Sequence, residues 1–219
     1  PPSMERTSQD EPASPVELRF TLGSIAEVDS EAIALGLFSN VEPAGAALSV
    51  DRLLDGAISD LARRRAIAAA AGEVFILPAA TARMRPRYVV FAGLGRFDRY
   101  GSPVQHLAAA NVTRTLALAG IRDFSLVLWG TASGVPPAHA AQSLLAGLLE
   151  ALAGLAPGRR PQRVTFVSRS PRRLAAAHAA MKMLLATSPR AGLVSLGTLP
   201  GGGARAPKAK APAPVSASY

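Results

Sequence analysis

The sequence predicts an α/β domain in which helices cover both faces of a mixed, mostly parallel sheet of about six strands. Apolar segments of strand length alternate along the chain with helical segments of roughly 15 residues, and connections of that length join parallel strands. Hydrophobic residues make up 49% of the 219 residues, whereas aromatic residues make up 5%. Small side chains, above all alanine, therefore let the helices pack closely.

Two strands are expected to open the domain, at residues 16–22 and 32–38. The first (VELRFTL) alternates apolar and polar residues, and the second (AIALGLF) is continuously apolar. We expect this pair to form an antiparallel edge of the sheet. A helix should follow, with Ser49 as its N-cap and with Arg63, Arg64 and Arg65 near its C-terminal dipole.

Two buried strands are predicted next, at residues 73–77 and 88–92, and then a helix with strong end signals. Ser102 is a typical N-cap, Gln105 is placed to complete a capping box, and Gly120 suits a left-handed stop. Pro103 fits the first turn of the same helix.

The remaining elements are two strands and two helices. Strands are predicted at residues 124–129 and 164–167. Between them, a helix after Pro137 carries a leucine stripe from Leu144 to Leu155. The last helix begins at Ser170-Pro171 and ends before Pro189. The domain therefore spans residues 16–199, between a flexible leader (1–15) and a basic linker or tail (200–219) rich in Gly, Ala, Pro and Lys.

Several segments resemble the N-terminal, macro-like domain of the M17 leucyl aminopeptidases. The most specific are GEVFILP at residues 72–78 and VVFAGLG at residues 89–95, and the likeness covers residues 31–155. The resemblance implies a three-layer α/β/α fold and, since these aminopeptidases form hexamers, a homo-oligomer. In these aminopeptidases a separate catalytic domain bears an Asn-Thr-Asp-Ala-Glu-Gly-Arg signature and a metal-binding Lys, and the sequence contains neither that signature nor room for that domain. The resemblance therefore does not imply peptidase activity.

The sequence shows few signals of catalysis. It has no cysteine, which excludes disulfides, thiolate metal sites and a cysteine nucleophile. His106, His139 and His178 fall in three different predicted helices without metal-ligand spacing. Residues 130–134 (GTASG) do not match the serine elbow G-x-S-x-G. We expect a chain that is not an enzyme and has no metal and no cofactor.

One weak ligand signal is the turn that follows residues 88–92. Gly93, Gly95 and Arg96 lie between a strand and a helix, where backbone amides bind phosphate groups in other folds. The third glycine of G-x-G-x-x-G is missing, so a simple tight turn is the alternative. Because macro-like domains elsewhere bind ADP-ribose, a nucleotide is a third hypothesis for the function.

The net charge of +9 is concentrated in the last third of the chain. All 15 Asp and Glu residues lie at or before Glu150, and 11 of the 24 Lys and Arg residues follow it. The densest cluster comprises Arg159, Arg160, Arg163, Arg169, Arg172 and Arg173. A strand through this cluster separates its two ends by roughly 20 Å, so one compact groove is disfavoured. The charges indicate either an acidic partner or a solvated basic surface.

The leading hypothesis is a non-catalytic macro-like module for protein assembly or regulation. Its partner is expected to be another protein or a further domain of a longer chain, and the module itself to form a homo-oligomer. Sequence-independent nucleic-acid binding through the basic third is the second hypothesis. No apolar run reaches the length of a membrane span, and the first residues are polar, so we expect a cytoplasmic protein that binds no membrane.

Overall fold

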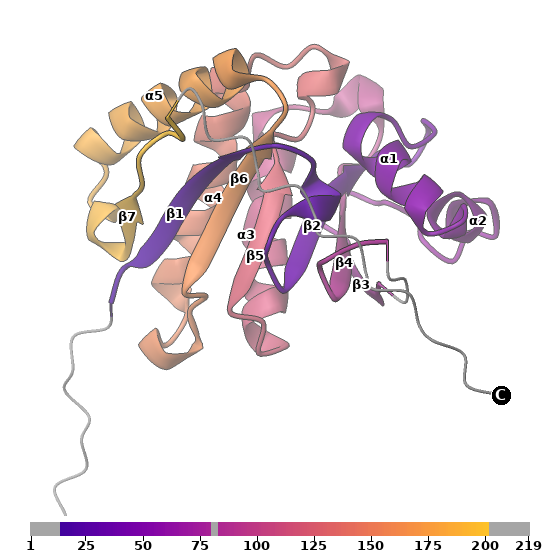
Figure 1. Ribbon diagram of the computed structural model, residues 1–219, viewed down its shortest axis with the longest axis horizontal. Helices are drawn as coiled ribbons and strands as arrows, with labels where there is room; N and C mark the ends of the chain where they lie inside the picture. The colour runs from indigo at the N-terminus through magenta and orange to yellow at the C-terminus, as the bar shows by residue number, and fades with distance from the viewer. Residues whose placement is uncertain (1–13, 80–82, 202–219) are drawn as a thin grey trace, which may run out of the picture.

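The computed structural model describes residues 14–79 and 83–201, so most of the expected leader and tail lies outside the described residues. These residues form one seven-stranded sheet in the order β3-β4-β2-β5-β6-β1-β7 (Figure 1). The strands are β1 (Val16–Leu22), β2 (Ala32–Leu37), β3 (Val74–Pro78), β4 (Tyr88–Gly93), β5 (Asp123–Val127), β6 (Arg163–Ser168) and β7 (Val194–Leu196). The mixed, mostly parallel sheet is confirmed, with one strand more than expected. The extra strand, β7, was not expected because three residues are too short to show a period.

Five α-helices connect these strands in the described part of the chain. They are α1 (Gly45–Leu53), α2 (Ala57–Arg63), α3 (Ser102–Leu118), α4 (Pro137–Gly154) and α5 (Pro171–Thr187). As expected, the Ser170 hydroxyl accepts the backbone N–H of Arg173 and so caps α5. Gly120 adopts φ +78°, the left-handed conformation expected after α3. None of the described helices is long and apolar enough to cross a bilayer.

The predicted antiparallel pairing of the first two strands is wrong. β1 lies between β6 and β7, β2 lies between β4 and β5, and all four of these contacts are parallel. The unbroken apolar run in β2 suits a strand that is buried on both faces and has two neighbours. The antiparallel strand is instead β3, which pairs with β4, the next strand along the chain, and lies at the sheet edge, only half-buried.

Two predicted helix caps are also wrong. Ser49 lies inside α1, where its hydroxyl donates to the carbonyl of Gly45 at 3.0 Å. The helical segment breaks at Gly56 (φ +81°), and the buried Asp51 carboxylate caps the second half, α2, by accepting the N–H of Ile58 at 2.8 Å. This cap links α2 firmly to α1.

At α3, the capping box predicted from Ser102 and Gln105 does not form. The N-cap residue is Gly101, and Ser102 is the first residue of the helix. Gln105 is buried, and its side chain donates to the carbonyl of Trp129 at 3.0 Å. The glutamine therefore holds the loop after β5 rather than the start of its own helix.

Two apolar clusters hold the helices on the sheet. α3, α4 and α5 pack on one face, over the alternate residues of β1, β6 and β5 that include Leu18, Phe124 and Phe166. α1 and α2 pack on the other face, over β2, β4 and β3, through Val50 and Ile58. These layers confirm the three-layer α/β/α architecture (Figure 1).

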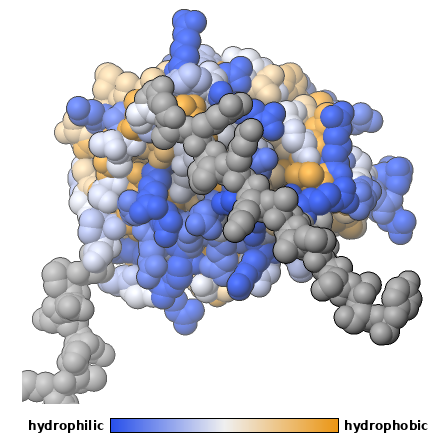
Figure 2. Space-filling view, in the orientation of Figure 1, coloured by the Kyte–Doolittle hydropathy of each residue, from blue (hydrophilic) through white to orange (hydrophobic). Residues whose placement is uncertain are grey.

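None of the described α-helices packs on the second face of β1, β6 and β5 (Figure 1), and the part of this face visible in Figure 2 is hydrophilic, although Ser125 and Thr165 on it are buried. It carries the ion pairs Arg19–Glu17 (2.7 Å) and Arg163–Asp123 (3.5 Å). Hydrogen bonding to Arg19 lowers the pKa of Glu17, whereas burial raises the pKa of Asp123. The helical layer on this side is therefore confined to the β2–β4 half of the sheet.

The α3–α4 contact depends on a glycine that allows the two backbones to approach closely. A Cβ atom at Gly147 of α4 would lie 2.2 Å from the carbonyl oxygen of His106 on α3. We therefore expect Gly147→Ala to lower the free energy of unfolding by about 2 kcal/mol. A Cβ atom at Gly154 would meet nothing within 4 Å, so Gly154→Ala in the same helix should have no cost. Urea denaturation followed by circular dichroism tests both, and equal stability of the two variants contradicts the packing argument.

An ionic cluster on the surface of α3 and α4 predicts a pH effect. The Glu150 carboxylate bonds His106 at 2.5 Å and Arg114 at 2.6 Å, and these bonds lower its pKa below the usual 4.5. Because its pKa is lowered in the folded state, the Glu150 carboxylate raises the free energy of unfolding above pH 4.5. This contribution is lost as the pH falls through the pKa of Glu150 in the folded state. Because the carboxylate is 41% exposed, Glu150→Gln should cost only about 0.5 kcal/mol at pH 7. Urea denaturation should show that this difference shrinks as the pH falls below 4.5 and vanishes once the folded-state carboxylate is protonated; a constant difference argues against the electrostatic origin.

Candidate functional site

A cleft of about 330 Å³ lies at the edge of the sheet where the parallel strands β1, β2, β5 and β6 all end. The segments that follow these strands line it, together with the first turn of α1. Carboxyl ends of parallel strands are the usual place for a ligand in α/β folds, because the connecting loops diverge there. The topology therefore places this cleft at the candidate functional site.

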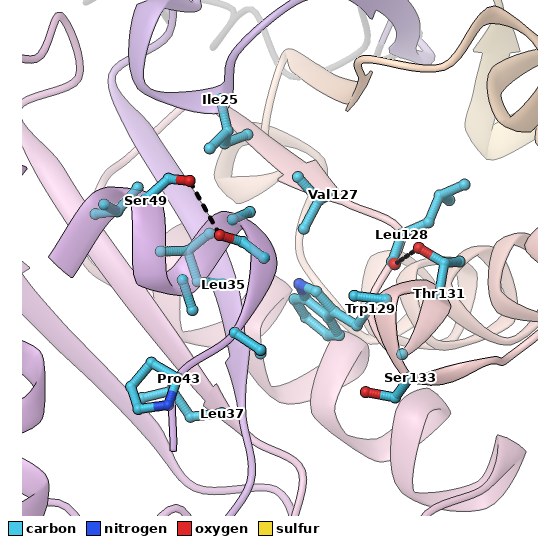
Figure 3. Close-up of a pocket in the computed structure, with 18 of the residues that line it drawn as sticks. Ile25, Leu35, Leu37, Pro43, Ser49, Val127, Leu128, Trp129, Thr131 and Ser133 are labelled. Atoms are coloured by element: carbon cyan, nitrogen blue, oxygen red, sulfur yellow. Dashed lines mark hydrogen bonds between the residues drawn. The ribbon is translucent and has the colours of Figure 1, made fainter. Parts of the chain in front are cut away.

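The floor of the cleft is apolar, and its rim is polar. Leu35 and Leu37 of β2 lie opposite Trp129, Thr131 and Ser133, which follow β5 (Figure 3). The leucines and the indole are buried. Hydroxyl groups and backbone edges form the rim, whose ionisable side chains are those of Glu42, Arg169 and Arg173. A cleft of this kind suits a ligand with both an apolar part and charged groups.

The loop after β5 is held in place by its indole and by its glycines. The Trp129 Nε1–H donates to the carbonyl of Ala34 in β2 at 3.3 Å. Gly130 (φ +81°) and Gly134 (φ +96°) flank the short 3₁₀ helix η3 (Thr131–Ser133). A Cβ atom at Gly130 would lie 2.5 Å from the ring of Tyr100, so only glycine fits there.

The Tyr100 side chain supports this loop from beneath. Its hydroxyl is buried and has no hydrogen-bond partner among the described residues, and burial raises the pKa of the phenol. The ring also packs edge-on against Phe38, with the centroids 5.0 Å apart. The loop that borders the cleft therefore packs against the Tyr100 ring, which in turn packs against Phe38.

The opposite rim is the start of α1. Residues 43–47 line the cleft, so the positive end of the α1 dipole faces it. Gly45 adopts φ +56°, and a Cβ atom there would lie 3.4 Å from the Cβ of Ala132. The α1 rim and the η3 turn thus approach each other closely and present backbone groups to the same space.

The glycine turn predicted to bind an anion borders the cleft but does not line it. The Gly93 and Gly95 amides donate to the carbonyls of Glu73 (2.8 Å) and Ala69 (2.9 Å), and of this turn only the buried Leu94 lines the cleft. Arg96 bonds Asp98 at 3.0 Å, which lowers the pKa of that carboxyl. Anion binding at Gly93, Gly95 and Arg96 stays a prediction, one that these hydrogen bonds disfavour.

The six arginines of the basic cluster fall at opposite ends of β6. At its amino end, Arg160 donates to the carbonyls of Leu152 and Leu155, and Arg163 pairs with Asp123. Arg159 lies at the same end, in the 3₁₀ turn Pro157–Arg159. At the carboxyl end, Arg169, Arg172 and Arg173 surround the start of α5, and only the first and last of these line the cleft.

The three histidines serve helix packing or lie on the surface. His106 bonds Glu150, His178 bonds the carbonyl of Gly197 at 3.1 Å, and His139 is exposed on α4. Over residues 14–79 and 83–201, no group of three or more His, Cys, Asp or Glu side chains is arranged to hold a metal ion.

The sequence did not predict most of the residues that line the cleft. The available signal was the segment GTASG at residues 130–134, which closely follows β5 and contains two glycines, both in the left-handed conformation. Its mismatch to a serine elbow concealed its place in the lining of the cleft. The contribution of α1 could not be found, because its N-cap was expected at Ser49, five residues after the observed N-cap, Ala44.

Comparison with solved structures shows a macrodomain fold. The macrodomain of Oceanobacillus iheyensis with ADP superposes with a TM-score of 0.63 at 15% identity, over 78% of this chain and 93% of that one. The Trypanosoma brucei macrodomain in complex with ADP gives 0.61 at 13% identity, over 76% and 69% of the two chains. The macrodomain of Mycobacterium tuberculosis DarG gives 0.56 at 14% identity, over 70% and 98%.

Comparison of the sequence identifies the family. No protein of curated function matches it. The N-terminal domain of the cytosol aminopeptidase family matches residues 34–152, and this match lies within the segment of resemblance expected from the sequence. Since it covers more than half of the 219 residues, the chain belongs to the cytosol aminopeptidase family, as a macro-like N-terminal domain.

Proposed function

We propose that this macro-like module binds a nucleotide of the ADP or ADP-ribose class in the cleft at the carboxyl edge of the sheet. The observation that carries the proposal is the convergence of four strand ends, the positive end of α1 and two arginines on one space of about 330 Å³. Backbone amides and guanidinium groups bind diphosphates, while the apolar floor accommodates a base or a sugar face.

The comparisons support this choice of ligand. Two of the similar structures are macrodomains with ADP, and another is a mutant of the Oceanobacillus iheyensis macrodomain with ADPR. Because those chains share only 13–15% identity with this one, the ligand is inferred from fold and cleft together.

Binding without chemistry is the role we propose for the module. The aminopeptidase signature is absent from the sequence, and the cleft offers arginines, hydroxyls and backbone groups around a single carboxylate. We place the module in the cytoplasm, in assembly or regulation with another protein, a further domain of a longer chain, or copies of itself.

Ala132→Glu tests the cleft directly. The substitution puts a negative charge on the η3 rim, beside the start of α1, and should weaken ADP or ADP-ribose binding at least tenfold by repelling the diphosphate. Ala156→Glu is the matched control, since Ala156 is also exposed in a loop but precedes β6, away from the cleft. Isothermal titration calorimetry measures both. Equal affinities for the two variants, or no heat with the parent chain, reject the proposed function.

Nucleic-acid binding is the alternative, and the structure suggests how to test it. The arginine cluster is divided between the two ends of β6, and Arg160 and Arg163 already bond protein groups. We therefore expect no complex with short duplex DNA at about 150 mM salt, and a weak, sequence-independent one only near about 50 mM salt. Size-exclusion chromatography with light scattering checks this and gives the oligomeric state. A stable DNA complex at the higher salt favours the alternative.

A further inference from the structure

The start of α5 carries positive charge where a helix disfavours it. Arg172 and Arg173 lie in the first turn, Arg169 directly precedes the Ser170 cap, and the turn contains no acidic residue. The N-terminus of a 17-residue helix is already the positive end of its dipole, so cations there reduce helix stability. An unfavourable arrangement of this kind is expected where the charges serve binding.

Two of these arginines face the cleft, and the third does not. Arg169 and Arg173 line the cleft, whereas Arg172 lies outside it. In the part of the chain that the structure describes, no carboxylate forms an ion pair with any of the three. Their guanidinium groups are exposed and are available to a ligand.

The charges of the cleft are therefore arranged asymmetrically. Arg169 and Arg173 come from the β6–α5 side, and Ser24 of the turn after β1, the strand beside β6, also lines the cleft. The one carboxylate of the lining, Glu42, comes from the segment that leads into α1, beyond β5 and β2. An elongated ligand would thus meet two cations at one end and a carboxylate at the other.

We propose that Arg169 and Arg173 form a subsite for a terminal phosphate, so that the cleft selects nucleotides ending in a free phosphate over those whose last phosphate is esterified. This inference rests on the proposed function. A terminal phosphate carries roughly two negative charges at pH 7, which two guanidinium groups neutralise with bidentate hydrogen bonds. In ADP-ribose both phosphates are diesters with one charge each, and the ribose occupies the position of the terminal oxygen.

The test compares ADP with ADP-ribose by isothermal titration calorimetry, on the full chain at constant ionic strength. ADP should bind the parent chain about tenfold more tightly. Arg173→Gln and Arg169→Gln should each remove most of that difference while changing ADP-ribose affinity less than threefold. Arg172→Gln is the matched control, because it removes the same charge one residue away, outside the cleft. It should leave the preference for ADP intact.

Thermal denaturation without ligand separates binding from folding. Since the arginines oppose the α5 dipole, all three glutamine variants should melt at the same temperature as the parent chain or above it. A tighter complex with ADP-ribose, or equal losses in the Arg172 and Arg173 variants, overturns the subsite.

Inorganic pyrophosphate distinguishes this proposal from the proposed function. If neither nucleotide binds but pyrophosphate does, with a loss in Arg173→Gln and none in Arg172→Gln, the anion subsite stands and nucleotide binding fails. If nucleotides bind without any preference for ADP, the proposed function stands and the subsite fails. If none of the three binds, both are wrong.

Discussion

The parallel pairing of β1, β6, β5 and β2 is the constraint on which the rest of the molecule depends. Four neighbouring strands that run in one direction must all end at the same edge, and each must be followed by a segment that leaves that edge. Those segments diverge to opposite faces of the sheet, toward α5 and α4 on one side and α1 on the other. The cleft lies where they separate, so its position follows from topology and its chemistry from the few residues beside the strand ends.

Small residues make this arrangement compact. β2 carries Gly36 where the Leu94 and Trp129 side chains cross it, and a Cβ atom there would lie 2.6 Å from Leu94 Cδ1. The same close approach occurs between α3 and α4, where glycine and alanine bring the two helix backbones together. A composition rich in alanine and poor in aromatic rings thus produces thin layers around a few large side chains, such as Phe91, Phe124 and Phe166.

Most of the fold could be predicted from sequence, because hydrophobic periodicity and the Ser, Pro and Gly residues at helix ends indicate local structure. Ser170-Pro171 and Gly120 marked true helix ends, and the apolar runs marked true strands. Pairing was harder to predict, since the neighbours of β2 lie more than 50 residues away in the chain and no local pattern encodes them. The caps failed for a related reason. Gln105 bonds Trp129, which only the tertiary structure brings near, and Asp51 caps α2 across a break in the helix at Gly56 that the apolar spacing did not indicate.

The candidate site was less predictable than the fold, because the cleft is lined by loops and strand ends that lie far apart in the sequence. Glycine-rich turns look alike in sequence, although the one at Gly93 packs against Ala70 and the one at Gly130 opens onto the cleft. Charge was only a partial guide, because the arginine cluster contains residues that bond carbonyls at one end of β6 and residues that face the cleft at the other.

The buried Asp51 carboxylate joins α1 and α2 through hydrogen bonds. It belongs to α1, yet it accepts the first amides of α2 and the Ser59 hydroxyl, at 2.5 Å from the latter. The first turn of α1 borders the cleft, and α1 and α2 pack on the same apolar cluster over β2 and β4. Loss of this one carboxylate would therefore leave the first amides of α2 without their acceptor and would separate two helices that now cover this half of the sheet as one unit.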